Sequence, residues 1–180
     1  LPGSYKVHVA NSLGYINEWY DNIPDQGNGS TEAGLVDLST SNATGIDFEL
    51  DEGRSISGTV TGPEGEPLED VFVRLRDEAG NYLNYTWTDS SGNYLLEGLV
   101  PGAYKLYTSN DEGYLDEWYD DVPYGDNYSG EGADLVSVIR ADAIGIDFEL
   151  EATHSISGTI TEEATGLPVA DADLTVCDAD

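Results

Sequence analysis

A dense run of oxygen-bearing side chains between residues 110 and 134 offers the clearest chemistry in the sequence. This stretch, NDEGYLDEWYDDVPYGDNYSGEGAD, carries nine Asp or Glu residues. Oxygen ligands of this kind bind Ca²⁺, although the stretch lacks DxDxDG spacing and a run of charges also solvates a surface. The expected calcium ligands are Asn110, Glu117, Asp120 and Asp121, because the positions 99 residues earlier also carry oxygen donors.

Two tryptophans, Trp19 and Trp118, stand in the repeated tetrapeptide Glu-Trp-Tyr-Asp. Aromatic faces stack on sugar rings, and repeated sites add avidity, so carbohydrate is one expected partner. A tryptophan at a fixed place in each repeat also packs a core or the joint between two sandwiches. We favour this packing interpretation over sugar stacking.

No arrangement for nucleophilic catalysis stands out. Such catalysis needs a His, Cys or Lys held beside a Ser or a carboxylate. His8 corresponds to Tyr107 in the next repeat. Cys177, the single cysteine, corresponds to Arg76, so it neither recurs nor has a disulfide partner in the chain. We therefore expect no enzyme activity, no catalytic residue and no cofactor other than Ca²⁺.

Four tripeptides match the acceptor pattern for N-glycosylation, and they begin at Asn28, Asn42, Asn84 and Asn127. Asn28 and Asn127 occupy the same loop position in their repeats. The pattern is short and also arises by coincidence in Asn-rich loops. Glycosylation at these residues is an expectation that depends on the organism.

The charge of the chain limits its partners. There are 36 acidic and six basic residues, which give a formal net charge of −30. Nucleic acid and anionic membranes are repelled, because no basic stripe replaces phosphate counterions. No stretch approaches the ~20 apolar residues of a membrane helix. The acidity can serve solubility, adaptation to brine or Ca²⁺ binding, and the sequence leaves these three alternatives open.

An internal repeat of about 100 residues organises these motifs. Residues 2–24 match residues 101–123 at an offset of 99, and GIDFEL followed by SISGT recurs at an offset of 100. The pattern predicts the C-terminal half of one repeat over 1–52, a complete repeat over 53–152 and the N-terminal half of the next over 153–180.

The two partial repeats admit two explanations. Either these residues come from a longer array, or the ends of neighbouring chains complement each other head to tail. The first is favoured, because the joint from IDFEL to SISGT is short. Both explanations make neighbouring repeats or copies of the same protein the expected partners, and both predict a fibre-like object.

Short apolar runs with a period of two, separated by Gly-rich and Asp-rich turns, predict an antiparallel sheet protein. Within the complete repeat the expected strands lie near residues 55–61, 70–76, 82–88, 93–98, 103–109, 114–119, 134–139 and 145–150. This number of strands fits an immunoglobulin-like sandwich. The predicted fold is all-β, with tandem immunoglobulin-like β-sandwich repeats of about 100 residues.

The segments SISGTVTGPEGEPLEDVFVRL, TDSSGNYLLEGLVPGAYKL, EWYDDVP and GIDFEL resemble carboxypeptidase regulatory-like repeats. These are prealbumin-like sandwiches of secreted microbial proteins, related to the B-type repeats of surface adhesins. The resemblance implies a spacer or accessory domain without catalysis of its own. We expect a structural repeat of an extracellular stalk, fibre or filament on, or released from, a microbial cell surface. A ligand-binding adhesin module and an accessory domain of a secreted enzyme are the alternatives.

Overall fold

The computed structural model describes residues 1–25, 27, 31–125 and 128–177, and its strands confirm the all-β prediction. No helix able to cross a membrane occurs in these residues. The strands are β1 (Ser4–Tyr5), β2 (His8–Val9), β3 (Glu18–Trp19), β4 (Ile23–Pro24), β5 (Val36–Asp37), β6 (Arg54–Thr61), β7 (Phe72–Asp77), β8 (Tyr82–Trp87), β9 (Asn93–Leu99), β10 (Ala103–Ser109), β11 (Glu117–Trp118), β12 (Val122–Pro123), β13 (Val136–Ser137), β14 (Ala143–Ile144) and β15 (Phe148–Glu149).

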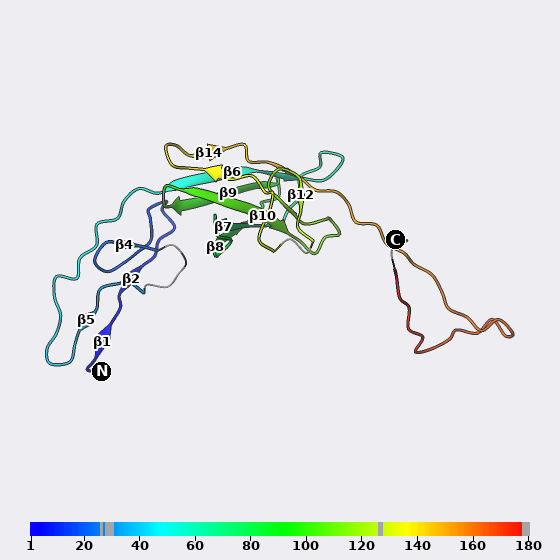
Figure 1. Cartoon of the computed structure of the whole chain (residues 1–180), viewed down its shortest axis with the longest axis horizontal. Coiled ribbons are helices and arrows are strands. Elements are labelled where there is room, and N and C mark those ends of the chain that lie inside the picture. Colours follow the sequence, from blue (N-terminus) through cyan, green and yellow to red (C-terminus); the bar gives the residue numbers. More distant parts are fainter. Residues whose placement is uncertain (26, 28–30, 126–127, 178–180) are drawn as a thin grey trace.

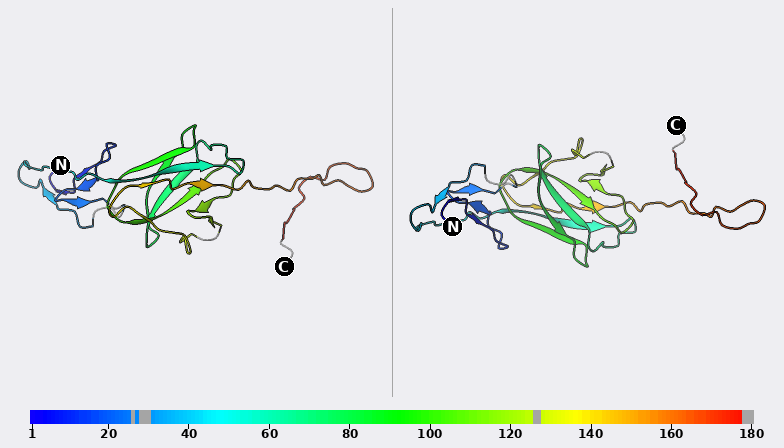
Figure 2. Two further views of the ribbon diagram at one scale, coloured as in Figure 1. Left: turned by 90° about the horizontal axis from the view of Figure 1, so that it is seen from above. Right: turned by 90° about the horizontal axis from the view of Figure 1, so that it is seen from below.

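Three parts of the chain follow one another in space in sequence order (Figure 1, Figure 2). We name them the preceding segment (1–52), the central sandwich (53–152) and the following segment (153–177). The preceding segment holds β1 to β5, and the central sandwich holds β6 to β15. The number of repeats in the chain stays a prediction.

The central sandwich is built from two sheets. In one, β6 pairs antiparallel with β9 and parallel with both β14 and β15. The other has the order β12-β11-β10-β7-β8, with β13 also paired to β10. Between β14 and β15 the amides of Gly145 and Ile146 both donate to the Ser57 carbonyl, at 3.0 and 3.1 Å. The chain therefore bulges at this point, and the Ile146 carbonyl lies against Gly58 of β6.

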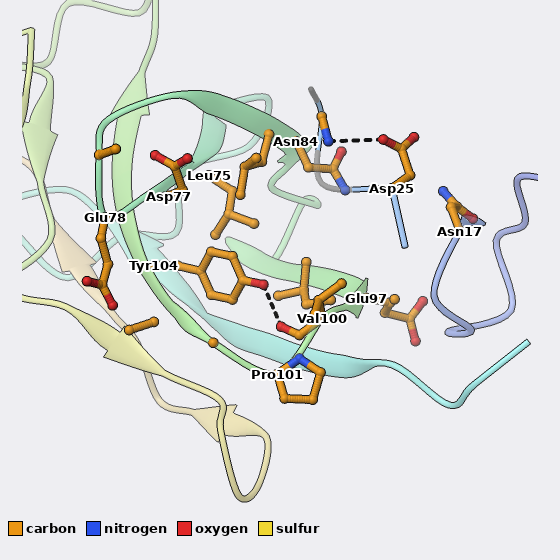
Figure 3. Close-up of a pocket in the computed structure, with 17 residues that line it drawn as sticks. Asn17, Asp25, Leu75, Asp77, Glu78, Asn84, Glu97, Val100, Pro101 and Tyr104 are labelled. Carbon is orange, nitrogen blue, oxygen red and sulfur yellow. Dashed lines mark hydrogen bonds between the residues drawn. The ribbon is translucent and has the colours of Figure 1, made fainter. Parts of the chain in front are cut away.

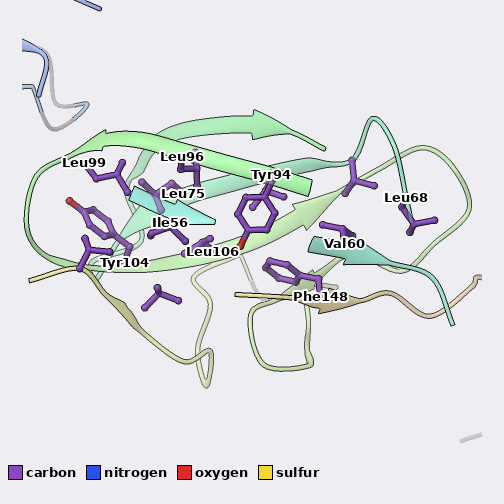
Figure 4. Packing of buried hydrophobic residues seen from close by; sticks show 14 of the residues in the cluster. Ile56, Val60, Leu68, Leu75, Tyr94, Leu96, Leu99, Tyr104, Leu106 and Phe148 are labelled. Carbon is purple, nitrogen blue, oxygen red and sulfur yellow. The ribbon is translucent and has the colours of Figure 1, made fainter. Parts of the chain in front are cut away.

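Alternation along the strands divides core from surface. In β7 the side chains of Val73 and Leu75 are fully buried, whereas those of Phe72 and Arg74 lie on the outer face. Figure 4 shows the inward side chains of both sheets meeting between them. The fully buried members of this cluster are Ile56, Val60, Val71, Val73, Leu75, Leu96, Leu106, Val138 and Leu150. Their removal from water is the main stabilising contribution to the fold.

The predicted strands are confirmed for β6 to β10, and the later ones are shorter than predicted. The strand expected over 114–119 is reduced to β11, because the chain turns back directly after Trp118. Asp120 and Asp121 have φ values of 69° and 60° in this turn, a conformation that Asp tolerates better than most residues. The turn creates the β11–β12 hairpin, which the sequence reading missed.

The pentapeptide SISGT occurs twice, with two different structures. In β6 it forms the central strand, and Ile56 is 0% exposed. In the following segment Ile156 is 80% exposed, and residues 153–159 form no strand. The strands that pair with β6 have no counterparts among residues 153–177, so the same side chains find no apolar surface to cover them.

Candidate functional site

Backbone hydrogen bonds hold the linker between the preceding segment and the central sandwich. Residues 51–53 run alongside residues 14–16 of the preceding segment, and we name this pair of segments the first joint. Amide-to-carbonyl bonds of 2.9 Å run from Gly53 to Gly14 and from Ile16 to Asp51, on either side of a β-bridge between Tyr15 and Glu52. The linker is therefore paired along its length before it enters β6.

The same contacts recur at the other end of the central sandwich. Residues 151–153 run alongside residues 113–115, which we name the second joint. Amide-to-carbonyl bonds run from Thr153 to Gly113 at 2.7 Å and from Leu115 to Glu151 at 2.8 Å, flanking a β-bridge between Tyr114 and Ala152. These residues follow those of the first joint by 99 or 100 positions. The joint is thus a repeated structural feature.

One asparagine shapes the loop at each joint. The Asn110 Oδ1 accepts from the amides of Glu112 and Tyr114 at 3.0 and 3.3 Å. Its Nδ2 donates to the Tyr114 carbonyl at 3.2 Å and to Asp116 Oδ1 at 2.9 Å. Asn11 makes the equivalent bonds in the preceding segment. The asparagine recurs because the loop conformation uses both ends of its amide.

Glycines allow the first joint to close tightly. A Cβ on Gly53 would lie 2.4 Å from the Gly98 Cα and 2.7 Å from the Gly14 carbonyl oxygen. Gly98 itself has a φ of 69°, and a Cβ there would lie 2.7 Å from the Tyr15 carbonyl oxygen. No larger residue fits at either position without moving the preceding segment away from the sandwich.

Gly98→Ala is expected to open the first joint. The substitution adds the steric clash with Tyr15 to the cost of a positive φ, so we expect a loss of about 2 kcal/mol in unfolding free energy and faster hydrogen exchange at the Gly53 amide. Gly132→Ala is the matched control, because Gly132 has a φ of 84° and no atom within 4 Å of an added Cβ. The control should cost about 1 kcal/mol and leave exchange at Gly53 unchanged. Equal exchange in the two variants would contradict the tight joint.

A cavity of about 500 Å³ lies beside the first joint (Figure 3). Asp25 and Asn17 line it from the preceding segment, and Glu97, Val100 and Tyr104 line it from the sandwich. The Tyr104 hydroxyl donates to the Val100 carbonyl at 2.5 Å, and burial raises the pKa of this tyrosine. The hydroxyl of Tyr104 is therefore already hydrogen-bonded within the central sandwich.

An acidic pocket lies beside the second joint. Glu117 and Asp121 meet Glu149 and Glu151 there. Burial, followed by the charges of Asp121, Glu151 and Glu149, raises the pKa of Glu117 to about 7. At the same place in the preceding segment Glu18 is 7% exposed, and burial and then the charge of Asp51 raise its pKa. The carboxylate cluster therefore recurs together with the joint.

The predicted calcium ligands do not form one set. Asn110 lines a different hollow from Glu117 and Asp121, and its amide is occupied by the loop. Asp120 and Asp121 recur as Asp or Asn because both positions have positive φ, as Asp21 and Asn22 do. Among the described residues no group of three or more His, Cys, Asp or Glu side chains is placed to hold a metal ion. Calcium binding stays a prediction, and the pocket around Glu117 is where it is best tested.

Glu117→Gln is expected to stabilise the protein above pH 7 and to have no effect below pH 4.5. The carboxyl holds its proton more tightly when folded than when unfolded, so its contribution to stability falls as the pH rises from about 4.5 to about 7. Solvent screening of this half-buried group limits the gain to about 1 kcal/mol. Thermal melts at pH 4 and pH 8 measure it, with Glu78→Gln, in an exposed turn, as the control.

The Glu117→Gln variant also tests calcium binding, when its melting temperature and that of the native chain are measured with and without Ca²⁺. If Ca²⁺ binds in the acidic pocket, it raises the melting temperature of the native chain at pH 8 but not that of Glu117→Gln. A native melting temperature that is the same in calcium and in chelator at low ionic strength would exclude this site.

A sequence model of the carboxypeptidase regulatory-like domain matches residues 55–129, from β6 to the loop after β12. These residues are similar to a carboxypeptidase regulatory-like domain. The resemblance inferred from the sequence motifs is thereby confirmed. Colossin-A from Dictyostelium discoideum is 40% identical to this chain over 52 residues, which are 29% of this chain and, in whole per cent, 0% of Colossin-A. The chain therefore spans a very small part of that protein.

Solved structures resemble the chain only weakly. GBS52, the minor pilin of Streptococcus agalactiae, has a TM-score of 0.43 at 16% identity, covering 79% of this chain and 66% of that one. The Bacillus anthracis TIE protein has a TM-score of 0.38 at 16% identity, covering 56% and 16%. Hydroxyquinol 1,2-dioxygenase from Pseudomonas putida DLL-E4 has a TM-score of 0.37 at 13% identity, covering 56% of each chain. Likenesses this weak carry no information on function.

The predicted stacking tryptophans are packed within the protein. In the regulatory-like domain Trp118 is 0% exposed, its ring lies 4.6 Å from that of Tyr107, and a Cβ on Gly130 would lie 2.9 Å from the indole. Trp19 is half-buried, and its ring lies 4.4 Å from that of His8, which corresponds to Tyr107. Trp118 is therefore no platform for a sugar, and the packing interpretation accounts for the recurrence of both residues.

The glycosylation predictions fall in different surroundings. Asn42 is exposed in a stretch without strands, and Asn84 is exposed on β8 of the regulatory-like domain beside the joint cavity. Asn28 and Asn127 lie outside the described residues. All four stay predictions.

Proposed function

We propose that this chain is a structural repeat of an extracellular stalk, fibre or filament on, or released from, a microbial cell surface. Its function is to hold successive sandwiches in line, without catalysis. One observation carries the proposal: the backbone pairing of residues 51–53 with 14–16 is repeated by residues 151–153 and 113–115. A paired linker limits the rotation of one unit against the next, which a flexible linker does not.

Backbone relaxation measured by NMR tests this proposal. We expect order parameters of about 0.85 for residues 51–53, equal to those of β6. Residues 154–160, with the same SISGT sequence but no strand partner, should have values below about 0.6. Low values at residues 51–53 would make the linker a flexible tether and would contradict the proposal.

Neighbouring repeats or copies of the same chain are the proposed partners, joined head to tail. In the following segment the side chains of Ile156, Leu167 and Leu174 are 80%, 62% and 74% exposed. Ile156 corresponds to Ile56, which is fully buried in the central sandwich. Apolar side chains in this pattern are those that a complementing strand covers.

A further inference from the structure

The outer face of β7, β8 and β10 carries aromatic and cationic side chains in cross-strand rows. Phe72 stands between Trp87 of β8 and Ser109 of β10, and Arg74 stands between Tyr85 and Tyr107. Val73 and Leu75, which alternate with them, point into the core. Trp87 is 46% exposed and Tyr85 48%, so large rings reach solvent on this face.

A hollow of about 670 Å³ opens beside these rings, within the size range of small-ligand sites, about 300–1,000 Å³. Phe72, Trp87 and Arg74 form its wall on the strands. Its rim carries polar groups from the end of β10 and from two loops, namely Asp70, Ser109, Asn110, Asp111 and Glu112. Two aromatic rings offer a surface on which a small molecule can pack, and the more numerous polar groups can fix its orientation, so the hollow suits a polar ligand.

The donors and acceptors of the hollow suit hydroxyl groups. The guanidinium carbon of Arg74 lies 4.6 Å from the centroid of the Phe72 ring, and Arg74 forms no ion pair or hydrogen bond with another side chain in the described part of the chain. Exposed carboxylates of Asp111 and Glu112 stand opposite as acceptors. Sugar hydroxyls accept from a guanidinium and donate to carboxylates, while the apolar face of a pyranose ring packs on indole and phenyl rings.

Charge decides which saccharides fit. The rim carries three carboxylates and the chain a net charge of −30, so uronic acids, sulfated glycans and phosphates meet repulsion. A neutral saccharide avoids this repulsion.

The sequence of the next repeat does not keep the residues of this face. Asp70 of the central sandwich and Asp171 of the following segment occupy the same position in their repeats, and both have a positive φ, of 58° and 55°. This match aligns the residues that come after each of them. The core positions stay apolar in the following segment, where Leu174 replaces Val73 and Val176 replaces Leu75. At the outer positions, by contrast, Asp173 replaces Phe72 and Thr175 replaces Arg74. The joints recur and this face does not, so it is a specialised feature of the central sandwich.

We propose that the hollow between Phe72, Trp87 and Arg74 binds a neutral saccharide chain. The exposed Trp87 ring packs on a sugar ring, and the Phe72 ring supports the indole from behind, with 3.2 Å between the two centroids. Arg74 donates to hydroxyl oxygens, and Asp111 and Glu112 accept from hydroxyl groups. This site goes beyond the proposed structural role and does not depend on it.

NMR titration of the full chain with cellohexaose, maltohexaose, xylohexaose, mannohexaose and hexagalacturonic acid tests the site. We expect at least one neutral hexasaccharide to shift the amide resonances of β7 and β8 at millimolar concentration, and the acidic one to shift none. If no neutral probe shifts these resonances, or if the acidic probe binds as well as the neutral ones, the proposal is wrong.

Saccharide binding by variants of Trp87 and Tyr82 tests whether the hollow is the binding site. Trp87→Ala should weaken binding of the neutral hexasaccharide at least tenfold, whereas Trp87→Phe, which keeps a ring, should stay within threefold of the native chain. Tyr82→Ala is the matched control, because Tyr82 is 44% exposed on the same strand but does not line the hollow. Melting temperatures show that the variants fold. Equal loss in Trp87→Ala and Tyr82→Ala would overturn the assignment.

Discussion

Gly58→Ala is expected to lower the melting temperature of the central sandwich by more than about 12 °C, through a loss of at least about 3 kcal/mol in unfolding free energy. A Cβ on Gly58 would lie 1.8 Å from the Ile146 carbonyl oxygen and 2.5 Å from its carbon. Both are backbone atoms of the bulge between β14 and β15, so no side-chain rotation relieves the clash. The variant must give up part of the pairing that closes this sheet.

Gly158→Ala is the matched control, because it makes the same substitution in the second copy of SISGT. Gly158 occupies the same place in SISGT, and no atom lies within 4 Å of an added Cβ there. We expect no change in the cooperative thermal transition. Similar losses in the two variants would show that residues 155–159 pack as β6 does, which contradicts their strandless conformation and the open space around Gly158.

Phe148→Ala should cost about 3–5 kcal/mol of unfolding free energy, the range for deleting a buried aromatic ring. Phe148 is 2% exposed, and its ring packs edge-on against Tyr119 at 5.8 Å and near Tyr94 at 6.3 Å. Urea denaturation followed by tryptophan fluorescence measures the loss.

Phe48 in the preceding segment is the matched control, because it stands in an identical GIDFEL. Phe48 is only half-buried, with the Tyr20 ring 6.1 Å away, so Phe48→Ala should cost about 1 kcal/mol. If Phe48→Ala costs as much as Phe148→Ala, the preceding segment has a core as complete as that of the central sandwich.

Local alternation predicts β6, β7, β9 and β10, because each of these strands buries one face in the core. β8 has no buried side chain, and its prediction depends on the Gly-rich and Asp-rich turns at 77–80 and 89–92 that bound it. Pairing between distant residues was not predictable in the same way. SISGT forms a strand at 55–59, where β9, β14 and β15 pair with it, and none at 155–159, where residues 153–177 supply no such partner.

The recurrence of oxygen donors between repeats is a weak indicator of a calcium site in this chain. The recurring oxygen donors at Asn110, Asp120 and Asp121 are explained by loop hydrogen bonds and positive φ, which leaves Glu117 as the member with a distinctive environment. The saccharide hollow was missed because it does not recur. The outward position of Phe72 in a predicted strand is the signal that could have indicated it, since a large apolar ring there faces solvent.

The burial of Trp118 was also beyond the reach of local patterns. Its cover comes in part from Tyr124 and Gly130, which follow β12 in the sequence, and their approach to the indole depends on the β11–β12 hairpin. The turn in which Asp120 and Asp121 adopt positive φ values therefore makes the hairpin that buries the Trp118 ring. Local sequence patterns do not reveal this burial.

The distance between the preceding segment and the central sandwich tests the central claim most directly, because a structural repeat requires a fixed joint. Spin labels at Thr40→Cys and Ser90→Cys, both exposed, in a Cys177→Ser background allow this distance to be measured by double electron–electron resonance. We predict one narrow distance distribution that does not change with salt. A broad distribution, as expected of two bodies on a free tether, would contradict the proposed structural role.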